Sequence, residues 1–347
     1  MIVLARESRG LTQGDLAWRL GITAGTMSRI EGGLRSVTQS LLDQIAGLLG
    51  YPIEFFEQVD PIYGFGTSEV FHRKRQDVSQ KTINMIHAQI NMRRMHLERM
   101  LRGVEIGDVD IPYFDLDDFK GNVEDIARAV RAKWHIPGGP IRNLTKIVED
   151  ARGIVIPFNF GTSQIDAMSW WPPSVPPLFF LDYSWPSDRL RFSLCHELGH
   201  IVMHREYPNP NMEDQAHRFA AEFLMPERDI RPYLNDVSIP LLASLKPFWK
   251  VSMSALLYRA KELGVISPRH ARTLWMQMNK LGYRVHEPQE LDLPQEQPTL
   301  YREIIDVYRR SFQYTSSELA KILHLHEPEI RAIYLDQPTP LKVVVAN

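Results

Sequence analysis

The stretch His196-Glu197-Leu198-Gly199-His200 carries the residue types best suited to metal chemistry. Two histidines four residues apart on a helix project from one face, one turn apart. Their ring nitrogens can therefore hold one zinc ion at about 2.0–2.1 Å without bending the backbone. Glu197 projects to the side of that pair, which suits a general base for hydrolysis. Gly199 permits close approach of a neighbouring element, so the pattern predicts a catalytic zinc centre rather than a helix with buried, satisfied histidines.

A catalytic zinc centre also needs a third protein ligand and an open position. Two residues on the next predicted helix can supply that ligand, Glu213 and Glu222. An apolar stripe along this helix consists of Ala216, Phe219, Ala220 and Phe223. Glu213 lies at the edge of the stripe, beside the neighbouring helix, and we expect it to be the ligand. Glu222 lies on the far side of the helical wheel, where we expect it to face solvent.

Several nearby residues are candidates for supporting roles. A tetrahedral oxyanion needs stabilising donors, and three residues are near enough in sequence to supply them: His217, Tyr183 and Tyr207. His204 shares a face with His200 and is expected at the surface or behind the metal ligands. Cys195 is expected to be a small buried core residue rather than a reactive thiolate. The strand at 178–182 could pair with an extended peptide, although sheet packing explains its apolar residues equally well.

The elements that must position these residues follow from periodicity and helix-start signals. Amphipathic helices are predicted at 123–135 and 141–152, and short strands at 154–158, 165–170 and 178–181. Ser187 is expected to cap the helix that carries both histidines to about His204. A second helix is predicted at 212–224, and helices are expected to dominate residues 239–281. The metal-binding pattern thus lies on a helix that follows two short strands.

These residues resemble the ImmA/IrrE family of metallopeptidases. The resemblance covers about residues 111–280 and is carried by Arg189–His204 together with the segment from Glu213 to Pro226. It implies a zincin-like α+β fold, zinc ligands at His196, His200 and Glu213, and a general base at Glu197. His217 departs from the family, which usually has Asn or Asp there to orient a zinc-binding histidine. The departure concerns the tuning of the site rather than metal binding itself.

The N-terminal segment 1–56 resembles the Cro/repressor (XRE) helix-turn-helix, a lambda repressor-like, all-α fold. The resemblance is carried by Leu11–Ala17 and Gly21–Gly33, with Thr12 and Thr23 as helix starts and Gly21 as a helix end. In that geometry the second helix enters the major groove of an operator in double-stranded DNA. The residues expected to face bases are Ala24, Gly25, Thr26 and Arg29, with Gln13 and Ser28 near phosphates. Arg29 is the best candidate for reading guanine.

Charge is a difficulty for DNA binding by this segment alone. Residues 1–56 contain five Lys/Arg and five Asp/Glu, whereas duplex binding draws most non-specific affinity from cations. Residues 70–102 carry eight Lys/Arg against two Asp/Glu, and 78–102 should form a long helix. Arg73, Lys74 and Arg75 are therefore candidates for contacts with the DNA backbone, or alternatively lie on a solvated connector. A helix-turn-helix that only binds protein is the other alternative.

The chain as a whole is expected to be multidomain and mostly α-helical. Its 347 residues, net charge of −2 and 44% hydrophobic content fit two or three globular domains. The expected parts are a helix-turn-helix at 1–56, a connector with a basic helix at 57–110, a zincin-like domain at 111–286, a linker at 287–299 and a helical segment at 300–347. The single cysteine, the lack of a signal peptide and the absence of any apolar run near 20 residues indicate a cytoplasmic protein without a membrane span.

The predicted function is a DNA-binding regulator with a zinc-dependent peptidase domain. The resemblance implies a protein substrate such as a repressor, in phage, mobile-element or stress control. The alternatives are a non-catalytic regulator or antitoxin whose zincin domain binds a toxin partner, and a transcription factor with a decayed peptidase domain. Homodimers are common among such repressors, but no segment indicates one. Residues 300–335 weakly resemble a second helix-turn-helix, with docking or dimerisation as the alternative role.

Overall fold

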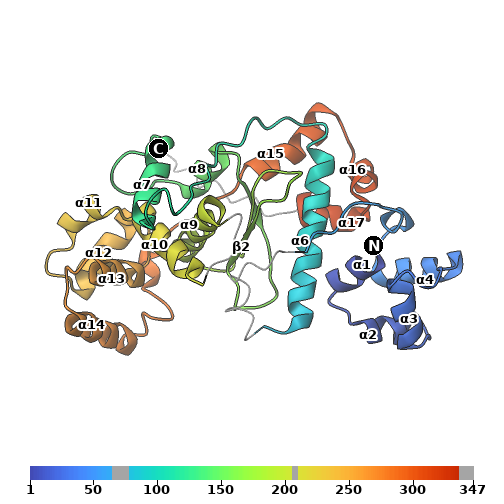
Figure 1. Cartoon of the computed structure of the whole chain (residues 1–347), viewed down its shortest axis with the longest axis horizontal. Coiled ribbons are helices and arrows are strands. Elements are labelled where there is room, and N and C mark those ends of the chain that lie inside the picture. Colours follow the sequence, from blue (N-terminus) through green and yellow to red (C-terminus); the bar gives the residue numbers. More distant parts are fainter. Residues whose placement is uncertain (65–77, 205–209, 336–347) are drawn as a thin grey trace. The chain divides into compact units, whose positions relative to one another are not determined.

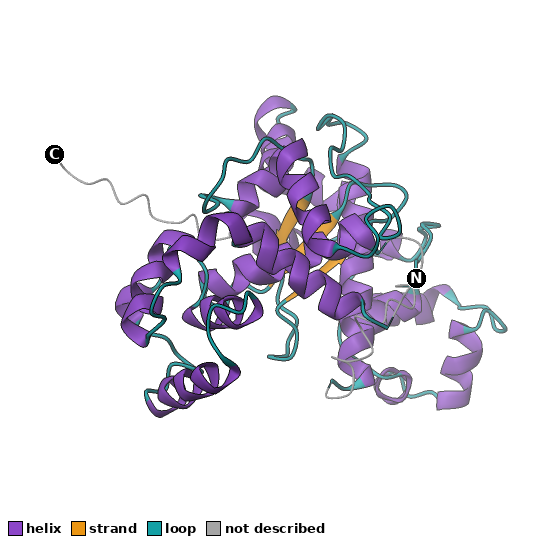
Figure 2. Cartoon of the chain, turned by 60° about the vertical axis from the view of Figure 1, so that its left-hand side comes forward, coloured by secondary structure: helices purple, strands orange, loops and turns teal. Residues whose placement is uncertain are grey.

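A computed structural model of the chain describes residues 1–64, 78–204 and 210–335. These residues divide into two compact units. One contains residues 1–64, 78–106 and 301–335, and the other contains residues 107–204 and 210–300. The mostly helical composition and the single small sheet confirm the predicted fold class (Figure 2). None of the described helices is long and apolar enough to cross a membrane.

The first unit is all helical and begins with a helix-turn-helix. Its first helices are α1 (Ile2–Ser8), α2 (Gln13–Arg19), α3 (Ala24–Glu31), α4 (Gln39–Leu49) and the short η1 (Ile53–Phe55). The Thr12 side chain accepts from the Asp15 amide and Thr23 from the Thr26 amide, as predicted for helix starts. Gly21 has φ of +67°, a left-handed conformation that glycine adopts without strain, and so separates α2 from α3.

The long helix α6 (Gln80–Met100) packs against α1 in the same unit. The predicted C-terminal helices complete this unit as α15 (Leu300–Asp306), η4 (Val307–Ser311), α16 (Ser316–Leu323), α17 (Glu327–Ile330) and η5 (Arg331–Leu335). The Tyr308 hydroxyl donates to the Met100 carbonyl at 2.8 Å, and Arg9 forms an ion pair with Glu329 at 2.9 Å. The C-terminal segment therefore docks onto helices that come more than 200 residues earlier in the sequence.

The second unit is an α+β domain built around three short strands. The sheet order is β1 (Ile154–Pro157), β3 (Leu178–Leu181), β2 (Ala167–Trp170), with β3 parallel to β1 and antiparallel to β2. The register pairs Val155 and Ser169 with Phe179 on either side. Because β3 is the central strand, its backbone is paired on both edges. The expectation that this strand could pair with a peptide is therefore wrong.

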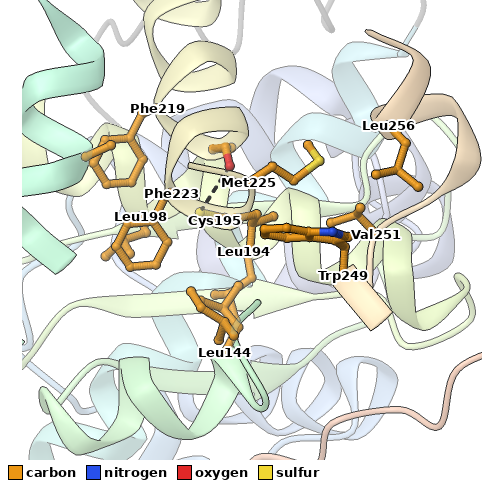
Figure 3. Packing of buried hydrophobic residues seen from close by; sticks show 14 of the residues in the cluster. Leu144, Leu194, Cys195, Leu198, Phe219, Phe223, Met225, Trp249, Val251 and Leu256 are labelled. Atoms are coloured by element: carbon orange, nitrogen blue, oxygen red, sulfur yellow. Dashed lines mark hydrogen bonds between the residues drawn. The ribbon is translucent and has the colours of Figure 1, made fainter. Parts of the chain in front are cut away.

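Helices cover the sheet and carry the predicted metal-binding residues. In chain order they are α7 (Val123–Lys133), α8 (Leu144–Asp150), α9 (Ser187–Met203), α10 (Met212–Leu224), α11 (Glu227–Ile230), η2 (Arg231–Tyr233), α12 (Ile239–Trp249), α13 (Met253–Glu262), α14 (Pro268–Lys280) and η3 (Gln289–Leu291). Helices α9 and α10 lie side by side (Figure 1). Their apolar faces form much of the core, where Leu194, Cys195 and Leu198 of α9 meet Phe219 and Phe223 of α10 (Figure 3). Burial of such side chains is the main stabilising contribution to this domain.

Acidic side chains hold the predicted linker at 287–299 against this domain. Glu287 accepts from the Met253 amide at 3.1 Å and from the Lys246 ammonium at 2.8 Å. Glu296 forms a buried ion pair with Arg191 of α9 and accepts from the Thr145 amide at 2.8 Å. Charge-assisted hydrogen bonds of this kind are stronger than neutral ones. The segment is thus anchored to several helices of the domain, among them α9, which carries the histidine pair.

Candidate metal centre and DNA-binding helix

Helix α9 brings three predicted site residues to one place because its opposite face is buried. Leu194, Cys195, Leu198 and Val202 are nearly inaccessible to solvent and fix the rotation of the helix. The helix begins at Ser187, but its N-cap is Pro186, so the predicted cap is wrong. The Ser187 hydroxyl instead donates to the Pro294 carbonyl at 3.0 Å. This rotation leaves His196 and His200 one above the other beside α10, with their ring centroids 4.8 Å apart.

Gly199 lets α10 approach α9 closely. A Cβ at this position would lie 3.1 Å from Phe219 Cδ1 and 3.3 Å from the backbone Cα of Ala216. The apolar stripe predicted on α10 is fully buried at this contact. Glu213 lies one turn before Ala216, so the close packing brings its carboxylate to the two histidines.

The three side chains have ligand atoms at distances that match a tetrahedral zinc site. The Nε2 atoms of His196 and His200 are 3.1 Å apart. The Glu213 carboxylate oxygens lie 3.5 Å from His196 Nε2 and 3.4 Å from His200 Nε2. A tetrahedron with metal–ligand bonds of about 2.0–2.1 Å has edges of roughly 3.3 Å. Among the described residues, these three form the group of His, Cys, Asp and Glu that could hold a metal ion.

A buried atom without a partner indicates that the group suits a cation. Glu213 Oε1 is buried and accepts no hydrogen bond from the described residues. A buried carboxylate oxygen without a partner is costly, and a bound cation would remove that cost. Burial would raise the pKa of the Glu213 carboxyl, but contacts with His196 and His200 lower it below its usual range. Burial also lowers the pKa of His196, so the neutral, metal-binding form of its ring is favoured.

His204 orients one of the histidines. Its Nε2 lies 2.9 Å from Gln215 Oε1, and its Nδ1 lies 2.9 Å from His200 Nδ1. Burial, followed by the charge of His200, lowers the pKa of His204 to about 3, so the ring is neutral near pH 7. A neutral ring that donates to the Gln215 oxygen must accept at its Nδ1 from His200 Nδ1–H. His200 Nε2 then carries a lone pair that faces Glu213 and His196, as a metal ligand requires.

The sheet supplies a residue that the sequence analysis missed. The Ser169 hydroxyl on β2 donates to Glu197 Oε2 at 2.7 Å and lies 3.3 Å from the Glu197 backbone carbonyl. Glu197 is buried, so this bond fixes the direction of its carboxylate beside the histidines. The two residues are 28 positions apart, and only the packing of α9 on β2 brings them together. A serine among apolar residues in a short predicted strand was the available signal.

Glu222 belongs to a separate ion-pair cluster, and the expectation that it faces solvent is wrong. Its side chain is 2% exposed and forms ion pairs with Arg259 and, at 2.7 Å, with Arg128. It also accepts from the Glu227 amide at 3.2 Å. A carboxylate on the outer side of an amphipathic helix is buried here because α7 and α13 bring guanidinium groups to it. Its oxygens are therefore occupied by arginines.

The residues predicted to stabilise an oxyanion lie in different environments. The Tyr183 hydroxyl donates to the Glu296 carbonyl at 3.1 Å, and burial raises its pKa. His217 is exposed, with its ring centroid 5.0 Å from that of Phe192. Tyr207 lies outside the described residues.

Cys195 is buried, and its burial raises the pKa of the thiol, which confirms the prediction of a core residue.

In the other unit, the second helix of the helix-turn-helix presents its predicted DNA-facing residues on an outward surface. Ala24, Gly25, Ser28 and Arg29 are exposed, whereas Met27 and Ile30 are buried. Thr26 is half-buried, with its hydroxyl 3.0 Å from that of Thr23.

An acidic residue joins the first three helices of this module. Glu31 at the end of α3 accepts from Arg6 Nε at 2.6 Å and from Gln13 Nε2 at 2.8 Å. The Gln13 side chain is thus engaged in holding α2 against α3. Arg73, Lys74 and Arg75 lie outside the described residues.

Comparisons with protein families agree with both parts of the molecule. Residues 149–261 match the model of the IrrE N-terminal-like domain, which spans the sheet, α9, α10 and most of α13. Residues 4–54 match a helix-turn-helix domain model. No curated protein matches the chain at a significant level. The chain is therefore a DNA-binding regulator that joins an N-terminal helix-turn-helix domain to a peptidase-like domain of the ImmA/IrrE family.

Proposed function

We propose that the second unit is a zinc-dependent endopeptidase that cleaves a protein substrate, such as a repressor. The observation that carries the proposal is the group formed by His196, His200 and Glu213, whose ligand atoms have the spacing of a tetrahedral zinc site. When bound, a zinc ion would activate a water molecule and polarise the scissile carbonyl. The side chain of Glu213 is one-quarter exposed, which leaves the group accessible to substrate.

The residues of the chain supply the proton transfers. Glu197, held by Ser169, takes a proton from the attacking water as the new C–O bond forms at the peptide carbonyl carbon. As the C–N bond breaks, Glu197 passes this proton to the leaving amine. His217 is exposed one turn from Glu213 and is the candidate donor for the developing oxyanion.

The sheet offers a place for the substrate backbone. Strand β2 lies at one edge of the sheet and, among the described strands, pairs only with β3. An extended peptide added to this edge would form main-chain hydrogen bonds. Because Ser169 of β2 touches Glu197, such a peptide would pass the general base. We propose β2, rather than β3, as the strand that aligns the substrate.

The first unit would bring this activity to an operator. We propose that α3 enters the major groove, with Arg29 as the main base-reading residue and Ala24, Gly25, Thr26 and Ser28 beside it. Gln13 would act indirectly, since it holds Glu31 at the end of α3. A local module of this size would bind DNA with modest specificity unless two copies act together.

Metal analysis together with one substitution tests the peptidase proposal. Purified protein should contain about one zinc ion per chain, and His196→Ala should lose it. Glu197→Gln should keep the zinc and lose proteolysis of a co-expressed repressor, because only the general base is removed. If Glu197→Gln matches the wild type in every cellular phenotype, the peptidase function fails and a partner-binding role, as in an antitoxin, gains.

A further inference from the structure

A row of aromatic rings begins at the turn next to the proposed metal ligands. Phe192 lies one turn before His196 on α9, and His217 lies one turn after Glu213 on α10. Their ring centroids are 5.0 Å apart. Residues spaced by four on a helix share a face. These two rings therefore line the same side of the helix pair as the metal ligands.

The row continues across two further helices. Tyr258 of α13 has its ring centroid 6.3 Å from that of His217, and Trp275 of α14 has its centroid 5.0 Å from that of Tyr258. The Arg284 guanidinium lies 5.4 Å from the Trp275 centroid. We call Phe192, His217, Tyr258 and Trp275, with Arg284 at the end, the aromatic row. Its three steps correspond to the length of about five extended residues at most.

The exposure of the row favours a binding role over a purely structural one. Tyr258 is 53% exposed and His217 is exposed, while Phe192 and Trp275 are half-buried and pack against the core with part of each side chain accessible. Contiguous exposed apolar groups mark binding sites more often than isolated ones. The row also extends beyond the family match, since Trp275 and Arg284 follow residue 261. The row is thus continuous with the proposed active site and runs past the matched domain.

We propose that the aromatic row binds apolar and aromatic side chains of an extended polypeptide, on one side of the bond to be cleaved. Arg284, at the far end, would favour an acidic residue there. Rings accept apolar side chains by burial and by offset or edge-to-face contacts. The His217 side chain provides the ring that links Phe192 to Tyr258. The inference rests on the proposed peptidase function, because it specifies what that site selects.

Binding measurements without turnover test the aromatic row. The protein is the zinc-loaded Glu197→Gln variant of the full chain, and the readout is fluorescence anisotropy of labelled peptides. The probes are Ser-Leu-Phe-Leu-Phe-Ser-Glu and Ser-Asn-Ser-Asn-Ser-Ser-Glu. The first should bind at least about tenfold more tightly than the second. Adding Tyr258→Ala should remove most of that preference. Adding Tyr233→Ala, which truncates a tyrosine of similar exposure (46%) outside the row, should leave it intact.

A charge variant keeps the test valid if Tyr258→Ala disturbs folding. Arg284→Gln changes an exposed side chain and should weaken binding of the Leu/Phe peptide that ends in Glu, but not of its counterpart that ends in Gln. Three results would each overturn the proposal that the aromatic row binds peptide side chains. They are equal affinity for the Leu/Phe and Asn/Ser peptides, no binding of either peptide, and equal effects of Tyr258→Ala and Tyr233→Ala. A protein that binds the Leu/Phe peptide as expected but never cleaves protein would instead refute the peptidase function alone.

Discussion

At the scale of single residues, His204 orients one of the proposed metal ligands, His200, and is not itself one of them. It accepts from His200 and donates to Gln215, so it holds His200 in the tautomer that leaves Nε2 free. Mutation of a residue that hydrogen-bonds to a metal ligand typically lowers metal affinity by about 10- to 100-fold. We therefore expect His204→Ala to lower zinc affinity by about that factor, measured by competition with a chromophoric chelator. Gln215→Leu should act in the same direction but less strongly, and wild-type affinity in both variants would contradict this role.

His96 in the first unit gives a pH dependence with a defined sign. Burial, followed by the charges of Arg93, Arg99 and His324, lowers its pKa well below the usual value. Its Nδ1 also lies 2.6 Å from the Tyr334 hydroxyl. As the pH falls, His96 is protonated in the unfolded chain before it is protonated in the folded protein. The contribution of the neutral His96 ring to the free energy of unfolding is therefore fully present above about pH 6.5 and is lost as the pH falls.

The variant His96→Gln tests this pH dependence. In the wild type, protonation of His96 should contribute at most about 1.4 kcal/mol per pH unit to the slope of the free energy of unfolding against pH. His96→Gln keeps a polar partner for Tyr334 and removes the titration. The free energy of unfolding should then fall less steeply between pH 7 and 5 than in the wild type, as measured by urea titration. Parallel slopes would mean that His96 takes up its proton in the folded state.

At the scale of elements, the distance between α9 and α10 sets the geometry of the proposed metal centre. In Gly199→Ala the new methyl group would press on Phe219 and on the backbone of Ala216, so α10 must shift by a few tenths of an ångström. Glu213 would move with α10, and zinc affinity should fall roughly tenfold. The cost of overpacking, about 1–3 kcal/mol, is partly offset by the gain of about 1 kcal/mol in helix propensity.

The matched control for this substitution is Gly47→Ala. Gly47 lies in α4, and a Cβ there would meet no atom within 4 Å. This variant should gain the helix propensity alone and leave zinc affinity unchanged. Zinc affinity and urea stability should therefore separate the two substitutions. If Gly199→Ala binds zinc as tightly as the wild type, the close packing of α9 and α10 does not determine the position of Glu213 relative to the two histidines.

The elements near the site could be predicted from sequence where local forces decide them. Periodicity and side-chain caps are local signals, and they located α10, the strands and the helix-turn-helix closely. The burial of Glu222 could not be predicted because it depends on Arg259, which is 37 positions away. The contact of Ser169 with Glu197 likewise depends on how a helix packs on a sheet. The helical wheel describes one helix alone, so it cannot show which charges other elements bring to it.

At the scale of the whole molecule, the chain forms two units that alternate along the sequence. The first unit is assembled from three separate segments, and the C-terminal one is joined to α6 by the contact between Tyr334 and His96. The helix-turn-helix therefore depends on residues near the other end of the chain for a stable neighbour. By mass action, a ligand that binds one folded unit stabilises that unit. If the other unit unfolds independently, its unfolding temperature does not change.

Calorimetry can separate the two units with one ligand and one substitution. We expect two unfolding transitions. Zinc at a hundredfold excess over its Kd should stabilise one of them by about 2.7 kcal/mol. Tyr334→Phe removes the hydroxyl that faces His96 and leaves a buried ring nitrogen without this partner, which should destabilise only the other transition by about 1–3 kcal/mol. A single transition that moved under both changes would mean that the units unfold together, so that zinc loss at the peptidase-like domain would also destabilise the DNA-binding helices.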